Sequence, residues 1–195
     1  MWTNCYQKLY KENRAVLFKE RTEEMDKGYI QINTGKGKGK TTAALGTCIR
    51  TLIAGKKVFF GQFIKGQETA ELKLPDYFSG FHIEQFGEGC FIFREPDEND
   101  IELANNGLLK CGEALGSGDY DLVVMDEVNP AIHYGLLKTE DVIKVLQNKN
   151  EKTEAILTGR YAPPELIELA DLVTEMRKIK HYYDNGVAAR KGIEF

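Results

Sequence analysis

The chain contains 195 residues, 42% of them hydrophobic and 29% charged, which is typical of one globular domain and excludes a disordered chain. Its formal net charge of -4 argues against nucleic acid or an acidic membrane as a partner, because both favour a net basic surface. No apolar run reaches the ~18 residues of a membrane span. The four cysteines, which form no CxxC pair, favour a cytoplasmic protein with reduced thiols: Cys5, Cys48, Cys90 and Cys111.

Residues 1–27 are rich in Lys, Arg and Glu, with Leu9, Val16 and Leu17 among them. This pattern predicts a helical extension, and it is too charged for a signal peptide. A single compact domain is expected to follow, covering residues 28–195.

From Gly28 onward, short β-prone apolar runs alternate with longer helical stretches. The predicted strands are 29–34, 57–63, 81–86, 121–126, 154–159 and 172–176, and the predicted helices are one from Lys40 and others near 98–117, 139–149 and 164–170. This alternation predicts an α/β fold: a mostly parallel sheet with helices on both faces. Together with the loop at residues 34–42 described below, it indicates the P-loop, RecA-like type. Ligands bind beyond the carboxyl ends of such strands, so the loops after Asn33, Phe63, Met125 and Leu157 should face one site.

The segment TGKGKGKTT, residues 34–42, lies between a predicted strand and a predicted helix, as a Walker A phosphate-binding loop requires. The general pattern GxxxxGK[ST] has its first glycine where this chain has Thr34. Backbone N–H groups and the positive end of the helix dipole bind phosphate in such loops, whereas a flexible surface loop rarely joins an apolar strand to a helix. The expected nucleotide-binding residues are Thr34, Gly35, Lys36, Gly37, Lys38, Gly39, Lys40, Thr41 and Thr42, together with Arg160.

Several of these residues have more specific expected roles. Lys40 is expected to reach a phosphate, and Thr41 to offer its hydroxyl to Mg²⁺ or Mn²⁺. Arg160 follows a predicted strand, and its guanidinium can bind phosphate in a bidentate way. Gln62 and Lys65, near the end of another strand, are further candidates for the same cleft or are solvated loop residues.

The segment DLVVMDEV, residues 121–128, is an apolar strand that ends in Asp126 and Glu127, as in a Walker B element. Carboxylates at a strand end beside a phosphate loop can bind a metal and orient a reacting group. We expect Thr41, Asp126 and Glu127 to hold the metal, and Lys40, Thr41 and Glu127 to be catalytic. A solvated acidic strand end is the alternative.

Several motifs in order resemble one family, the ATP:corrinoid adenosyltransferases, which include bacterial cob(I)alamin adenosyltransferases. The resemblance covers about residues 28–195, and Thr34 looks like the family's own variant of the phosphate loop. It rests on TGKGKGKTTAALGT (34–47), QFIKG (62–66), VVMDEVNPAI (123–132), LTGRYAP (157–163), ADLVTEM (170–176) and KHYYDNGVAARKGIEF (180–195).

The resemblance implies that a Co(I) corrinoid attacks the 5′ carbon of ATP and that the whole triphosphate leaves. It also implies an electron donor such as a reduced flavoprotein and a homodimer. By pattern alone, Phe91 and Phe93 belong to a core or edge strand. The resemblance adds another role, an aromatic wall that binds the corrinoid and disfavours its lower axial ligand.

Two other functions share the phosphate-binding residues. A P-loop kinase or ATPase would act on the terminal phosphate of ATP, and a nucleotide- or corrinoid-binding module would show no turnover. The motifs outside the phosphate loop favour the adenosyltransferase, and only adenosyl transfer releases intact triphosphate.

Overall fold

A computed structural model describes residues 27–88 and 95–195 of the protein. Within these residues, six strands form one sheet in the order β3-β2-β4-β5-β1-β6, and each neighbouring pair is parallel. The strands are β1 (Ile30–Thr34), β2 (Val58–Phe63), β3 (Phe81–Phe86), β4 (Leu122–Asp126), β5 (Glu154–Thr158) and β6 (Leu172–Glu175).

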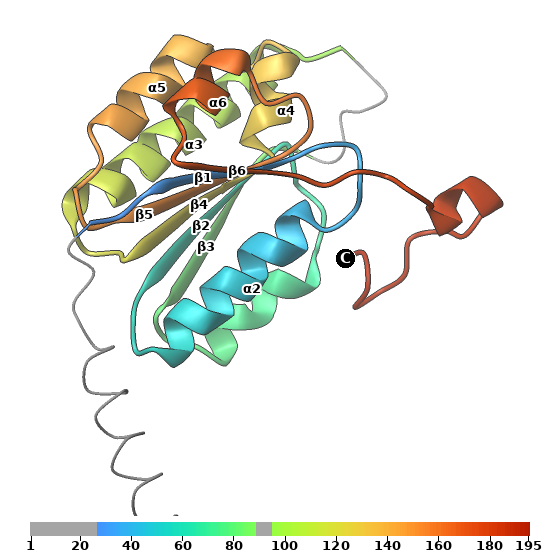
Figure 1. Cartoon of the computed structure of the whole chain (residues 1–195), viewed down its shortest axis with the longest axis horizontal. Coiled ribbons are helices and arrows are strands. Elements are labelled where there is room, and N and C mark those ends of the chain that lie inside the picture. Colours follow the sequence, from blue (N-terminus) through green and yellow to red (C-terminus); the bar gives the residue numbers. More distant parts are fainter. Residues whose placement is uncertain (1–26, 89–94) are drawn as a thin grey trace, which may run out of the picture.

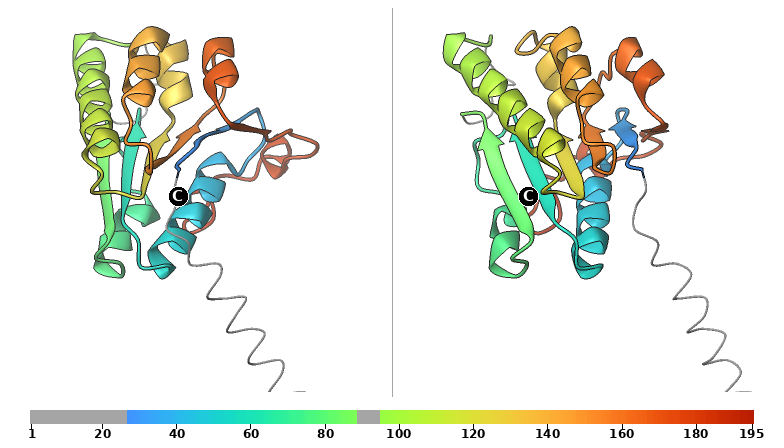
Figure 2. Two further views of the ribbon diagram at one scale, coloured as in Figure 1. Left: turned by 60° about the vertical axis from the view of Figure 1, so that its left-hand side comes forward. Right: turned by 90° about the vertical axis from the view of Figure 1, so that its left-hand side faces the viewer.

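Helices cover both faces of this sheet (Figures 1 and 2). One face carries α2 (Lys40–Ile53) and the 3-10 helix η1 (Ala70–Asp76). The other face carries α3 (Glu98–Ser117), α4 (Val128–His133), α5 (Thr139–Gln147) and α6 (Pro164–Leu169). A short 3-10 helix, η3 (Tyr182–Asn185), lies beyond β6. The predicted α/β fold of the P-loop type is therefore confirmed. Within the described residues, no helix is both long and apolar enough to cross a membrane.

The core consists of two apolar clusters, one on each face of the sheet. Successive residues of a strand point to opposite faces, so each central strand contributes to both clusters. In β4, for example, Val123 and Met125 pack on the α3 side, whereas Leu122 and Val124 pack on the α2 side. Burial on both faces explains why these strands have nearly continuous apolar sequences.

The order of the strands places the predicted site. β5 lies between β1, which leads into the phosphate loop, and β4, which ends in the two carboxylates. Because all the strands run in the same direction, the segments after β1, β2, β4 and β5 emerge at one edge of the sheet. The structure thus brings together four segments that are far apart in the sequence.

The six strands and four of the helices lie where the sequence predicts them, but three short elements were missed. Helix α4 has six residues with Pro130 among them, and η1 has seven residues with Pro75 inside. The third, η3, has four residues. Segments this short do not repeat the helical period often enough to be recognised. The predicted N-terminal extension lies outside the described residues except for Lys27.

Candidate nucleotide-binding site

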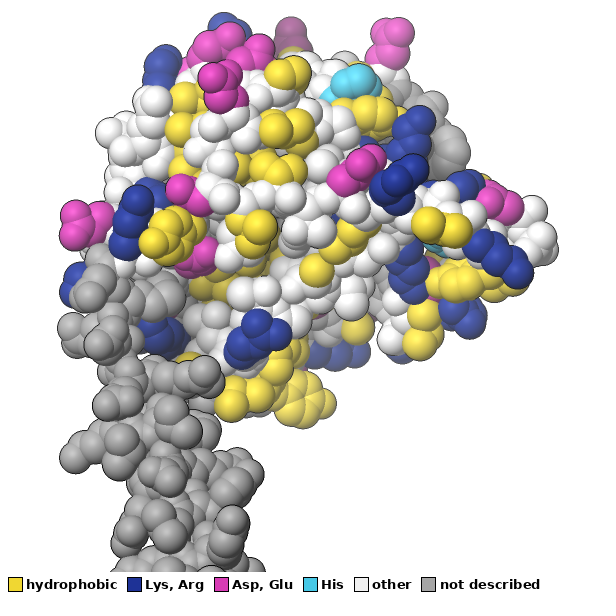
Figure 3. Space-filling model, in the orientation of Figure 1, with side chains coloured by type: hydrophobic (Ala, Val, Ile, Leu, Met, Phe, Trp, Pro, Cys, Tyr) yellow, Lys and Arg dark blue, Asp and Glu magenta, His cyan; other side chains and the backbone are white. Residues whose placement is uncertain are grey.

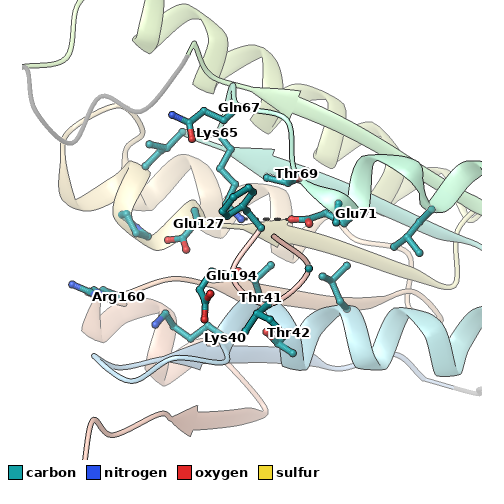
Figure 4. A pocket seen from close by; sticks show the side chains of 18 of the residues that line it. Lys40, Thr41, Thr42, Lys65, Gln67, Thr69, Glu71, Glu127, Arg160 and Glu194 are labelled. Carbon is teal, nitrogen blue, oxygen red and sulfur yellow. Dashed lines mark ion pairs between the residues drawn. The ribbon is translucent and has the colours of Figure 1, made fainter. Parts of the chain in front are cut away.

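A cavity of about 820 Å³ lies at the carboxyl edge of the sheet (Figure 4). It is lined by residues of α2, η1 and α4, by the segments that follow β2, β4 and β5, and by the end of the chain. Five residues of the predicted site line it: Lys40, Thr41, Thr42, Glu127 and Arg160. Lys65, a further candidate, lines it as well.

The N-terminus of α2 is suited to an anion. The residue before the helix, Gly39, has a φ of 118°, a conformation that favours glycine, and no side chain caps the helix. The first turn also contains no acidic residue. Its backbone N–H groups and the positive end of its dipole are therefore not neutralised by the protein's own carboxylates at this position.

The glycines of the phosphate loop are required by a close approach to the chain after β6. The Gly37 N–H donates a hydrogen bond to the Met176 carbonyl at 2.6 Å. A Cβ atom at Gly35 or Gly37 would lie 2.5 or 2.7 Å from the same carbonyl oxygen. Side chains at these two positions would separate the loop from the segment that follows β6.

Lys40 is buried at the base of the loop, with 8% of its surface exposed. Its ammonium group donates to the carbonyls of Gly35, at 3.0 Å, and Gly37, at 2.8 Å. Burial lowers the pKa of Lys40. An ammonium group has three N–H donors, so these two bonds leave one for a ligand in the cavity.

Asp126 links the phosphate loop to the neighbouring strands. Its carboxylate is fully buried and accepts hydrogen bonds from the hydroxyls of Thr41, at 2.9 Å, and Thr158, at 2.6 Å. Its second oxygen pairs with the Lys65 ammonium at 2.6 Å. Burial is the largest single effect on the pKa of Lys65 and lowers it, but the charge and hydrogen bond of Asp126, together with the charges of Glu127 and Glu71, outweigh burial and the pKa is raised. We call Thr41, Lys65, Asp126 and Thr158 the strand-end cluster.

Glu127 is directed differently from Asp126, because its backbone has a left-handed conformation with a φ of 59°. The Glu127 N–H donates to the Thr158 hydroxyl at 3.0 Å, which holds this turn in place. Its carboxyl group lines the cavity (Figure 4). Burial, and then the charge of Asp126, raise the pKa of Glu127.

Three described non-glycine residues have positive φ, and all three line the cavity: Ile64, Glu127 and Tyr161. Such a conformation costs about 1–2 kcal/mol for an ordinary residue and often occurs at functional sites. Each residue lies just after a strand, where the chain turns across the cavity. Tyr161 also stacks on His133, with ring centroids 4.0 Å apart.

The remaining predicted binding residues do not line this cavity. Thr34 ends β1 and its carbonyl accepts from Met176 N–H, while Lys36 is exposed on the loop. Lys38 faces the end of the chain, at a smaller pocket of about 270 Å³ that it forms with residues around Lys178 and Tyr182. Phe91 and Phe93 lie outside the described residues.

Sequence reasoning missed two parts of the cavity wall. One is apolar and comes from α2 and η1, including Leu45, Ile49 and Leu74. The other is the chain end: Gly192, Ile193, Glu194 and Phe195. The C-terminal motif KHYYDNGVAARKGIEF supported the resemblance, but only the path of the chain shows that it returns to the phosphate loop.

The arrangement fits a hard divalent cation bound together with phosphate. Thr41 and Glu127 present oxygens to the cavity, and the hydroxyl proton of Thr41 is already given to Asp126, which leaves its lone pairs for a metal. Such ions take few protein ligands and complete their coordination with phosphate and water. No group of three or more His, Cys, Asp or Glu suited to a metal occurs among the described residues.

A glycine-rich loop between strand and helix, with a lysine at its base and a buried carboxylate holding its threonine, defines the P-loop class of nucleotide-binding proteins. The family model of ATP:corrinoid adenosyltransferase BtuR/CobO/CobP matches residues 26–195. The chain therefore belongs to the ATP:corrinoid adenosyltransferase family.

Individual relatives agree with this assignment. The chain is 37% identical over 190 residues to a corrinoid adenosyltransferase of Sinorhizobium sp, covering 95% of this chain and 87% of the relative. It is 35% identical to a corrinoid adenosyltransferase of Pseudomonas aeruginosa, covering 87% and 85%. A corrinoid adenosyltransferase of Escherichia coli is 34% identical, with 87% of each chain covered.

Proposed function

We propose that this protein transfers the 5′-deoxyadenosyl group of ATP to the Co(I) centre of a corrinoid and releases triphosphate, in the synthesis or salvage of adenosylcobalamin. In this reaction the electron pair of Co(I) forms the bond to the 5′ carbon. The bond between that carbon and the triphosphate oxygen breaks, and its electron pair leaves with the triphosphate. The membership of the chain in the family, with the match over residues 26–195, carries this proposal.

The geometry of the cavity supports the roles proposed for individual residues. Lys40 and the N–H groups at the start of α2 would stabilise the charge that gathers on the departing triphosphate. Arg160 lines the same cavity and can bind phosphate oxygens. The backbone of residues 34–39 and the Thr42 hydroxyl would complete the phosphate site, and Lys38 would join them if it exchanged its present partners.

A divalent metal, Mg²⁺ or Mn²⁺, would be held by Thr41 and Glu127, with Asp126 as the carboxylate that orients Thr41. Bound there, it would neutralise phosphate charge as a Lewis acid. Asp126 would coordinate the ion directly only if Lys65 gave up its ion pair.

Other parts of the proposal rest on the family alone. They are a homodimer, an electron donor such as a reduced flavoprotein, and a corrinoid-binding wall that includes Phe91 and Phe93. A cytoplasmic location is proposed instead from the four cysteines, which form no CxxC pair.

The decisive experiment incubates the protein with ATP, Mg²⁺ and a chemically reduced corrinoid and measures both products. Adenosyl transfer gives the visible spectral change of a new cobalt–carbon bond and one triphosphate per adenosylcorrinoid. A kinase or ATPase would release ADP or orthophosphate instead, and a binding module would show no turnover. Either result would contradict the proposal.

A further inference from the structure

The chain end returns to the phosphate loop. After β6, the C-terminal segment, residues 176–195, leaves the sheet, forms η3 and turns back to finish beside α2 (Figure 1). Its last four residues line the cavity together with Lys40 and Arg160, and Glu194 lies on the phosphate-loop side of the cavity (Figure 4).

Lys38 holds this segment with all of its hydrogen-bonding capacity. Its ammonium group donates to the Tyr182 hydroxyl at 2.8 Å, the Ile193 carbonyl at 3.1 Å and the Glu194 carboxylate at 2.7 Å. An ammonium group has three N–H donors, so none remains for a phosphate oxygen. This differs from Lys40, which has two such bonds. Lys38 can therefore contact a phosphate only by exchanging one of its present partners.

Glu194 is the partner best suited to be exchanged. Its carboxylate also accepts from Tyr182, from the Arg190 backbone N–H at 2.7 Å and from the Arg190 guanidinium at 3.3 Å. These hydrogen bonds, from Arg190 first and then from Lys38 and Tyr182, hold its pKa well below the usual range, so the group stays anionic. If it lost Lys38, Glu194 would keep Arg190 and would not be left unpaired.

The ion pair between Lys38 and Glu194 is also exposed enough for a ligand to compete with it. Lys and Arg side chains gather around the C-terminal segment (Figure 3), and the Lys38 side chain is 35% exposed. Exposed ion pairs contribute little free energy because water and salt screen them. A polyphosphate carries several negative charges and gains further contacts at the loop, so it can replace a single carboxylate.

We propose that Glu194 is a positioning residue of the nucleotide site: its carboxylate holds the C-terminal segment against Lys38, and a polyphosphate oxygen takes its place on Lys38 when nucleotide binds. This inference rests on the proposed function, because it takes the phosphate loop as the site of the triphosphate. In the free protein the C-terminal segment would then cover part of the cavity, and it would move away from Lys38 when the negatively charged ligand binds.

Binding of tripolyphosphate and of ATP, each with Mg²⁺ and measured by calorimetry, tests the inference. Glu194→Gln keeps the shape of the side chain but removes its charge, so Lys38 is freed more easily. We expect Kd for tripolyphosphate to fall about threefold, the scale of one exposed ion pair. Tyr182→Phe removes another partner of Lys38 and should lower Kd in the same direction. The control is Glu165→Gln on α6, an exposed carboxylate outside the cavity, which should leave Kd unchanged.

A double-mutant cycle shows whether the effect passes through Lys38. Lys38→Gln should raise Kd for tripolyphosphate, and adding Glu194→Gln to that variant should change nothing further. If Glu194→Gln binds tripolyphosphate as the wild type does, or more weakly, Glu194 does not compete with phosphate and the inference is wrong. If the wild-type protein binds neither tripolyphosphate nor ATP, the proposed nucleotide site itself fails, and with it the inference.

Discussion

The strand-end cluster and the C-terminal segment both hold a lysine of the nucleotide site, but by different forces. In the cluster, Asp126 is fully buried and binds Lys65 after β2, the Thr41 hydroxyl of α2 and the Thr158 hydroxyl of β5. In the C-terminal segment, the side chains of Lys38 and Glu194 are 35% and 17% exposed, and most of residues 176–195 are exposed. The buried cluster should be part of the folded core, whereas the exposed one should respond to ligand and salt.

The largest effect is expected at Lys40. Its ammonium group donates to two backbone carbonyls and pairs with neither Asp126 nor Glu194. Lys40→Ala should lower kcat/KM for adenosyl transfer by about 10³-fold, because a preorganised cation is lost from the site of the leaving triphosphate. The corrinoid spectrum follows turnover, and a thermal melt checks the fold. Lys73→Ala on η1, an exposed lysine, is the matched control. A Lys40→Ala enzyme as active as this control would exclude the assigned role.

The next effect tests the buried cluster. Asp126→Asn leaves the Lys65 ammonium without its partner, and we expect the free energy of unfolding to fall by about 3 kcal/mol. Denaturant titration measures this value, with the exposed Asp76→Asn as control. Glu194→Gln in the same assay should stay close to the wild type, since its ion pair with Lys38 is partly exposed and is screened by water and salt. Equal losses for the two variants would remove the distinction between the two regions.

A smaller effect is expected where the phosphate loop meets the C-terminal segment. A Cβ at Gly37 would lie 2.7 Å from the Met176 carbonyl oxygen, so Gly37→Ala should push the loop away from the C-terminal segment. We expect kcat/KM to fall about tenfold or more, because small displacements of binding groups are costly. Gly46→Ala is the control: it lies in α2 with nothing within 4 Å of the new methyl group and should stabilise the helix by about 0.5–1 kcal/mol. Unchanged activity in Gly37→Ala would show that the contact with Met176 is not needed.

The last prediction is that the two buried cysteines of the core do not react with alkylating reagents in the native protein. Cys48 and Cys111 are buried, and burial raises the pKa of the Cys48 thiol to about 12 and that of Cys111 further. Thiolates are the reactive form, so neither residue should be alkylated in the native protein at pH 8, and both should react in denaturant. Mass spectrometry locates the modified residues. Cys48 and Cys111 ionise at a lower pH in the unfolded chain than in the folded one. Their contribution to the free energy of unfolding should therefore be fully present below about pH 9 and be lost as the pH rises further. Rapid labelling of Cys48 in the native protein would show that the α2 face opens readily.

The sequence by itself determined the fold class, the six strands and the main helices, because each strand is an apolar run and each long helix repeats its period several times. It also identified Lys40, Thr41, Glu127 and Arg160 as neighbours in one cavity, since the rule that parallel strands share a carboxyl edge needs no coordinates. Short elements such as α4 carry too few residues for such a signal.

Only the tertiary structure decided which carboxylate faces the cavity and which lysine is already engaged. Asp126 and Glu127 are adjacent in sequence, yet the left-handed turn at Glu127 separates a buried partner of Thr41 from a cavity-lining group. Lys38 and Lys40 are two residues apart, yet Lys38 binds Tyr182 and Glu194, more than 140 positions away. Contacts between such distant residues depend on how the whole chain packs, and no local pattern records them.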